Sequence, residues 1–123
     1  MIDKRKRDEV LRWLKKALSN MRAAKLLAHS EAAIFDIAAY HCQQTAEKAL
    51  KGFLIFHGLK VAKIHNVLSL WKQTARIAPG YYSWADAADR LTPLAFLFRY
   101  PGAELEPDTE IAQEAIEDSE TIF

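Results

Sequence analysis

The chain has 123 residues, half of them hydrophobic, and its formal net charge is +1 at pH 7. This size and composition suit one globular domain, residues 1–123, whose apolar core is large enough to need no disulfide or metal support. Four glycines and four prolines argue against an all-β or low-complexity chain, and the single cysteine excludes an intrachain disulfide.

Two long helices are predicted in the first half of the chain. The first runs from about Asp3 to His29, and the second runs from about Ala32 to His57, where Gly58 occupies the usual terminating position for glycine. We expect these two helices to form an antiparallel hairpin. The first helix carries a predicted apolar stripe of Val10, Leu11, Leu14, Leu18, Met21, Leu26 and Leu27.

Three shorter helices are predicted in the second half. Asn66 is the expected N-cap of a helix ending near Ile77, and Ser83 is the expected cap of a helix over 84–98. Pro93 should kink that helix or restart it, with Thr92 as the new cap. An acidic helix follows Pro107 and Asp108. The predicted fold class is therefore all-α, an up-and-down bundle of about five helices.

Charge is unevenly distributed along the chain. Residues 1–25 contain nine Lys or Arg and three Asp or Glu, whereas residues 100–123 contain eight Asp or Glu and no Lys or Arg. This pattern favours a basic first helix lying beside an acidic last helix. The alternative is a basic patch that binds a nucleotide or nucleic acid.

No apolar run reaches the roughly 18 residues that a membrane span requires, so no membrane contact is expected. The charged first residues lack the apolar segment of a secretory signal, and one cysteine fits a reducing compartment. We therefore expect a cytoplasmic protein. Cys42 lies beside the apolar side of its helix, where a packed thiol is expected rather than a reactive one.

The second predicted helix has two different sides. At about 100° per residue its apolar residues Ala46, Ala49, Leu50, Phe53 and Phe56 cluster on one side. The opposite side collects His41, Gln44, Glu47, Lys48 and Lys51. Such a set could bind a phosphate, a base or a partner helix. The alternative is a solvated surface on which Glu47 and Lys51 form an i,i+4 pair.

Four segments occur in an order and spacing that resemble the HEPN (higher eukaryotes and prokaryotes nucleotide-binding) domain family. They are residues 41–51, which contain the pattern QQ-x-A-E-K-x-x-K, residues 63–68 with His65, residues 91–93, and Arg-Tyr-Pro-Gly at residues 99–102. The resemblance covers nearly the whole chain. The Arg-Tyr-Pro-Gly variant resembles a branch often paired with minimal nucleotidyltransferases.

The resemblance implies a helical bundle that is usually a homodimer, with the two long helices near the dimer interface. It also implies a prokaryotic toxin–antitoxin-type pair with a minimal nucleotidyltransferase as partner. Many HEPN toxins are metal-independent ribonucleases, with an Arg, a polar residue and a His four to six residues after the Arg. In the dimer, both protomers contribute to that site.

The chain departs from this motif. Arg99 and Tyr100 occupy the expected place, but no histidine follows them, and the last histidine of the chain is His65. Asn20 stands where the family commonly has an acidic residue on the first helix. The motif therefore leaves ribonuclease activity open, with His41 as a substitute base.

Each candidate residue has a functional and a structural interpretation. Arg99 could bind phosphate or act as a helix C-terminal cation. His41 could act as a base or form an interface hydrogen bond, and His65 could contribute to binding or hold its loop. Gln44, Lys48 and Lys51 could contact a ligand, or Lys51 could pair with Glu47. Tyr100 is expected to pack rather than react.

No metal site and no cofactor is expected, because the sequence has no Cys pair, H-x-x-x-H or P-loop. Three hypotheses follow. The first is a dimeric module that binds a nucleotide or RNA, or a nucleotidyltransferase, through the His41–Lys51 side and Arg99. The second is a metal-independent ribonuclease toxin that uses Arg99 and His41. The third is a purely structural dimerisation bundle.

Overall fold

A computed structural model describes residues 3–29, 34–95 and 109–123. Its regular elements are all helical in this part of the chain, which confirms the all-α prediction. They are α1 (Lys4–His29), α2 (Phe35–Phe56), α3 (Val67–Ile77), the 3₁₀ turns η1 (Pro79–Trp84) and η2 (Thr92–Ala95), α4 (Ala85–Leu91) and α5 (Thr109–Ile122). Arg99 and Tyr100 lie outside the described residues.

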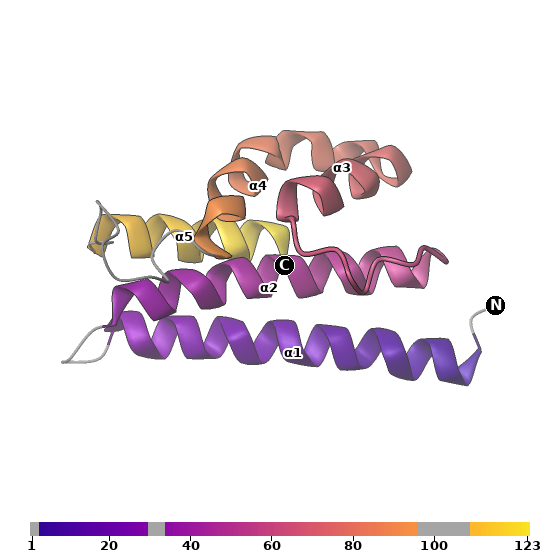
Figure 1. Cartoon of the computed structure of the whole chain (residues 1–123), viewed down its shortest axis with the longest axis horizontal. Helices are drawn as coiled ribbons and strands as arrows, with labels where there is room; N and C mark the ends of the chain where they lie inside the picture. The colour runs from indigo at the N-terminus through magenta and orange to yellow at the C-terminus, as the bar shows by residue number, and fades with distance from the viewer. Residues whose placement is uncertain (1–2, 30–33, 96–108) are drawn as a thin grey trace.

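The hairpin of α1 and α2 is the base of the bundle, and the two helices run antiparallel, as predicted (Figure 1). Small residues allow the helices to approach closely. A Cβ built on Gly52 would lie 3.1 Å from Leu14 Cδ2, and Ala17, Ala24 and Ala46 are almost fully buried. Close backbone approach at these positions brings the polar groups of the two helices within hydrogen-bonding reach.

The remaining helices pack on the side of α2 that faces away from α1 (Figure 1). Helix α5 lies along the N-terminal half of α2, while α3 and α4 pack beside its central and C-terminal parts. Thirteen residues of α2 are buried, against four of α1. Helix α2 is therefore the central helix of the bundle.

The predicted apolar stripe of α1 is only partly in the core. Leu11, Leu14 and Leu26 are exposed, Leu26 by 74%, whereas Ala17, Asn20 and Ala24 are buried. Helix α1 covers only one side of α2, so it buries a narrow strip of mostly small residues.

Two helix ends follow the predicted chemistry. Gly58 has φ 87° beyond the end of α2, and the amides of Gly58 and Leu59 donate to the carbonyls of Ile55 and Leu54. This is the Schellman pattern, which favours glycine because of its positive φ. Asn66 is the N-cap of α3, and its Oδ1 accepts from the amide of Ser69 at 3.0 Å.

The predicted cap of the fourth helix was wrong. Ser83 donates to the carbonyl of Gly80 at 3.2 Å, and Trp84 takes the N-cap position of α4 without a side-chain bond. Thr92 has a different role from the one predicted: its hydroxyl donates to Ala88 O and accepts from the amide of Leu68. Helix α4 ends at Leu91, and the chain continues as η2 through Pro93.

Ion pairs join the acidic last helix to its neighbours. Arg90 on α4 donates from Nε and Nη2 to both carboxylate oxygens of Asp118 at 2.8 and 2.7 Å, and Asp118 raises the pKa of Arg90 through these bonds. Lys25 Nζ lies 2.7 Å from Glu120 Oε1. The basic first helix and the acidic last helix therefore contact each other, as the charge pattern predicted. In the described residues, no helix is long and apolar enough to cross a membrane.

Candidate functional site

The polar residues of α2 divide into an outer and an inner group. His41, Gln44 and Lys48 are half-buried and reach the surface, whereas Glu47 and Lys51 are 3% and 1% exposed. The segment 57–66 crosses over the C-terminal half of α2 and covers the inner group (Figure 1). The five polar residues therefore do not share one accessible surface. The alternative i,i+4 pair of Glu47 and Lys51 forms at 3.5 Å, but it is buried and not solvated.

His41 is held by a residue of the neighbouring helix. Its Nδ1 lies 2.7 Å from Asn20 Oδ1, and Asn20 Nδ2 donates to the carbonyl of Lys16 at 2.8 Å. Because the amide nitrogen of Asn20 is committed to that carbonyl, its oxygen is the atom that accepts from His41. The neutral imidazole then carries its proton on Nδ1 and a lone pair on Nε2.

Burial and a neighbouring cation keep this imidazole neutral. Desolvation lowers the pKa of His41 from its usual value of 6.5, and the positive charge of Lys48 lowers it further. At neutral pH the side chain therefore offers Nε2 as a hydrogen-bond or proton acceptor. This is the protonation state that a general base requires.

Lys48 stands in a positively charged setting. Burial is the largest cause that lowers its pKa, Lys16 and Lys51 lower it further, and Glu47 acts in the opposite direction. Lys48 is therefore repelled by two neighbouring ammonium groups and attracted more strongly by the buried carboxylate of Glu47. An anion placed beside Lys48 and Lys16 would relieve this repulsion, so the electrostatics favour a negatively charged ligand.

The inner group holds the loop over α2. Lys51 Nζ donates to the carbonyl of Ala62 at 2.9 Å, lies 3.5 Å from Glu47 Oε2 and sits 5.2 Å from the centre of the Trp13 ring. His65 Nδ1 lies 3.4 Å from Glu47 Oε1, and that oxygen has no hydrogen-bond partner among the described residues. Glu47 and Lys51 are thus in contact with the loop rather than with solvent.

The two glutamines connect the outer group to this loop. Gln44 Nε2 donates to Gln43 Oε1 at 2.6 Å, and Gln43 Nε2 donates to the carbonyl of His65 at 3.3 Å. Gln43 is fully buried, so its amide acts on the loop backbone and on its neighbour. The ring of His65 is exposed and remains accessible while its backbone is held.

Three residues of this site were not selected by their sequence pattern: Lys16, Asn20 and Gln43. Asn20 was named only because of the resemblance to a family. Lys16 is one of several lysines on a basic helix, and nothing in the sequence distinguishes it from the others. A buried asparagine among the alanines of α1 is the one available signal, because such a side chain needs a partner. Nothing in a single sequence identifies that partner as His41.

Other chemistry receives no support in the part of the chain that the structure describes. No group of three His, Cys, Asp or Glu side chains there could hold a metal ion. Burial, the largest cause, raises the pKa of Cys42 to about 12, and Asp118 and Glu120 act in the same direction. Cys42 is therefore a packed thiol and not a nucleophile. Arg99 and Tyr100, two of the predicted site residues, fall outside the described residues.

The comparison with protein families gives one match. The family model described as HEPN domain matches residues 10–123, which is almost the whole chain. No curated protein and no solved structure matches the chain.

Proposed function

Because the chain belongs to the HEPN domain family, we propose that it binds a nucleotide through the outer polar group of α2. His41, Gln44 and Lys48, together with Lys16 of α1, would contact the ligand. The observation that carries this proposal is the neutral ring of His41, which Asn20 holds with Nε2 as acceptor, beside the half-buried ammonium of Lys48. A phosphate and a nucleobase edge would match these two features.

The proposal changes the role of two residues. Glu47 and Lys51 are buried beneath the 57–66 segment, so they would position the loop and not contact the ligand. Arg99 and Tyr100 remain proposed contact residues on the resemblance alone. His65 would contribute from the loop, where its ring is exposed by 75%.

The proposal includes a homodimer that pairs with a minimal nucleotidyltransferase as one component of a toxin–antitoxin-type system. Large apolar side chains on the long helices support an association of this kind. Leu26 is 74% exposed, and Ile34 and Ile37 are each 44% exposed near the same end of the hairpin. Apolar side chains grouped in this way favour burial against another protein surface.

A nucleotide-binding assay tests the proposal. The purified protein would be titrated with nucleoside mono-, di- and triphosphates while its thermal stability and heat of binding are recorded. The variants Lys48→Met and His41→Ala should each weaken binding, and Lys72→Met, which removes an exposed charge on α3, should leave it unchanged. If no nucleotide stabilises the protein and a co-expressed nucleotidyltransferase does not co-purify with it, the proposal fails.

A ribonuclease function is the second candidate, and the Asn20–His41 hydrogen bond is the observation that favours it. That bond orients the ring and leaves Nε2 as the acceptor that could activate a ribose 2′-hydroxyl. Labelled RNA would be incubated with the protein in EDTA. Cleavage that disappears in both His41→Ala and Arg99→Ala would establish a metal-independent ribonuclease. No cleavage by the unaltered protein would contradict the ribonuclease function and leave the binding function as the proposal.

A further inference from the structure

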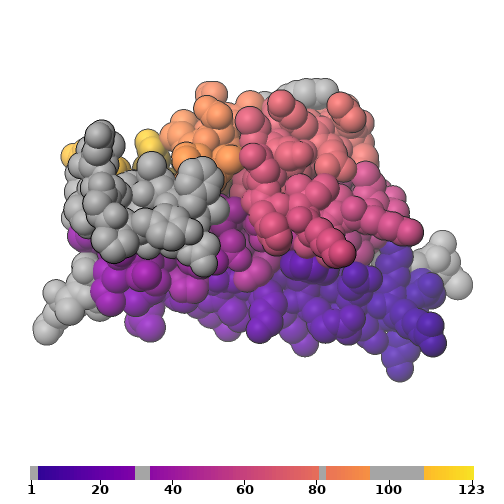
Figure 2. All heavy atoms as spheres, in the orientation of Figure 1, coloured from indigo at the N-terminus to yellow at the C-terminus, as the bar shows by residue number. Residues whose placement is uncertain are grey.

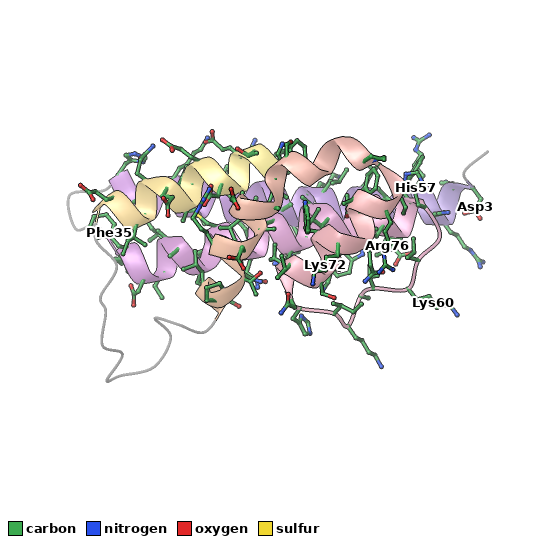
Figure 3. All side chains as sticks on the ribbon, turned by 90° about the horizontal axis from the view of Figure 1, so that it is seen from above. Asp3, Phe35, His57, Lys60, Lys72 and Arg76 are labelled. Carbon is green, nitrogen blue, oxygen red and sulfur yellow. The ribbon has the colours of Figure 1, made fainter. Side chains whose placement is uncertain are left out.

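A second cationic site lies at the other end of the hairpin, away from His41. There the first three turns of α1 and the segment after Gly58 line the two sides of an open cleft of about 900 Å³. Figure 2 shows the segment lying against α1 on this side of the molecule, and Figure 3 shows Lys60 projecting outward at the end that also holds Asp3. Among the described residues, none from the polar side of α2 lines it.

Five cationic side chains line this cleft from two sides. Three belong to α1 and two belong to the loop: Arg5, Lys6, Arg12, Lys60 and Lys63. None of the five forms an ion pair with a described residue, although Asp8 and Glu9 also line the cleft. The third carboxylate, Asp3, accepts a hydrogen bond from the amide of Lys6 at 2.9 Å and so serves as a helix cap. Positive charge exceeds negative charge in the cleft, and it is left uncompensated.

The loop side of the cleft is held in place by the core. Val61 is 2% exposed and anchors the segment, and the carbonyl of the next residue, Ala62, accepts from the buried Lys51. Lys60 and Lys63 flank this anchored pair and are exposed. Their backbone positions are therefore set before any ligand arrives, which reduces the entropy lost on binding.

The apolar floor and the spacing of the cations restrict the ligand. Leu59 and Ile64 are half-buried beside the lysines, so the cleft combines apolar and cationic walls. Arg5 and Arg12 are seven residues apart, which places them about 10 Å apart along one side of α1. A single phosphate cannot contact cations spread over that distance and over both walls, whereas a linear chain of phosphates can.

We propose that this cleft binds an oligophosphate chain, either as the free anion or as the phosphate tail of a nucleotide. Arg5, Arg12, Lys60 and Lys63 contact its oxygens, with the lysines acting as point charges and the arginines as bidentate donors. In a nucleotide the base lies on Leu59 and Ile64. The site is separate from the His41 group, so the proposal can be correct or wrong whatever the outcome for the function proposed above.

Titration calorimetry without divalent cations tests this proposal, with inorganic tripolyphosphate, a nucleoside triphosphate and inorganic phosphate as the three probes. Tripolyphosphate should bind at least tenfold more tightly than phosphate. A nucleoside triphosphate that binds to the His41→Ala variant more tightly than tripolyphosphate does identifies the nucleotide as the ligand of the cleft, and equal binding identifies the free chain. If tripolyphosphate does not bind, or binds no better than phosphate, the proposal is wrong.

Three sets of variants locate the site. Lys60→Gln with Lys63→Gln should raise the Kd for tripolyphosphate at least tenfold, and Arg12→Gln should weaken binding from the opposite wall. Asp8→Asn with Glu9→Gln should do the reverse and tighten binding, because those carboxylates repel the anion. Lys72→Gln with Arg76→Gln removes two charges from α3, outside the cleft, and His41→Ala alters the other site; both should bind normally (Figure 3).

Comparing the α3 double variant with the loop double variant distinguishes binding in the cleft from attraction of the anion by the net charge of the protein. If the α3 double variant loses as much affinity as the loop double variant, net charge alone attracts the anion and no site exists in the cleft. Melting temperatures of all variants are measured first. Should the loop variant fail to fold, the opposed effects of Arg12→Gln and the Asp8–Glu9 pair still confirm or overturn the proposal.

Discussion

The outer and inner polar groups of α2 contain similar side chains on one helix, yet their surroundings give them opposite properties. His41, Gln44 and Lys48 meet α1 and the surface, while Glu47 and Lys51 lie beneath the 57–66 segment. In the inner group Lys51 pairs with Glu47 and donates a hydrogen bond to the loop carbonyl of Ala62, so this lysine holds the loop on α2. In the outer group the ammonium of Lys48 and the neutral imidazole of His41 are only half-buried, so a ligand can reach them. Helical periodicity alone does not show which polar residues of α2 are buried and which reach the surface.

The largest effect should come from breaking the inner pair. Lys51→Met leaves the carboxylate of Glu47 buried without its cation and frees the carbonyl of Ala62, so it should reduce the free energy of unfolding by about 3–5 kcal/mol. Urea denaturation would measure this, with the exposed Lys72→Met as the matched control. Adding Glu47→Leu to Lys51→Met should recover part of the loss. A loss below about 1 kcal/mol in the single variant would contradict the buried pair.

Removing the link between α1 and the outer group should have an intermediate effect. Asn20→Ala leaves His41 Nδ1 without its acceptor and the carbonyl of Lys16 without its side-chain donor, which should cost about 1–3 kcal/mol. Chemical denaturation provides the value. A matched change on the exposed side of α1, Ser19→Ala, should cost less than about 0.5 kcal/mol.

The Asn20–His41 contact can also be tested by changing the charges next to His41 and measuring its pKa. Asn20→Asp places a carboxylate against Nδ1 and should raise the pKa of His41, because an opposite charge favours the protonated ring. Lys48→Met should raise that pKa as well, since it removes a repelling cation. Titration of the imidazole by NMR would record both shifts. A fall in either variant would show that the hydrogen bond or the cation has been misassigned.

The lowered pKa of His41 predicts a modest pH dependence of stability. Above the unfolded pKa of 6.5 the ring is neutral in both states and has no effect. As the pH falls below 6.5 the unfolded chain takes up a proton more readily than the folded protein, so stability decreases until the folded pKa is passed. Denaturation between pH 7.5 and pH 5 should show this slope. The slope should be smaller in His41→Gln, and an unchanged slope would assign it to other groups.

The smallest effect should come from the exposed ion pair between α1 and α5. Lys25 and Glu120 are 46% and 45% exposed, so Lys25→Ala should reduce stability by less than about 1 kcal/mol. High salt should remove most of the difference between the variant and the unaltered protein, because exposed charges are screened. A large, salt-independent loss would mean that packing of the Lys25 side chain, and not its exposed charge, provides the stability at this contact.

Much of the fold could be predicted because its signals are local. Asn66 caps α3 through an amide three residues away, and Gly58 ends α2 because its positive φ suits glycine. The apolar periodicity of the long helices and the prolines between the shorter helices are also local signals, because each depends on residues a few positions apart. Ser83 failed as a cap because the preceding residues form a 3₁₀ turn that binds its hydroxyl, a preference the sequence does not display.

The site itself depends on contacts between distant residues. The sequence determined that residues 41–51 form a helix with polar groups at fixed spacing, because those preferences arise within the helix. Only the tertiary structure decided that Asn20 meets His41 across 21 positions and that Lys51 reaches Ala62 across 11. A polar residue is solvated or buried according to what packs over it, and at Glu47 and Lys51 that covering is a loop whose path is set by the core.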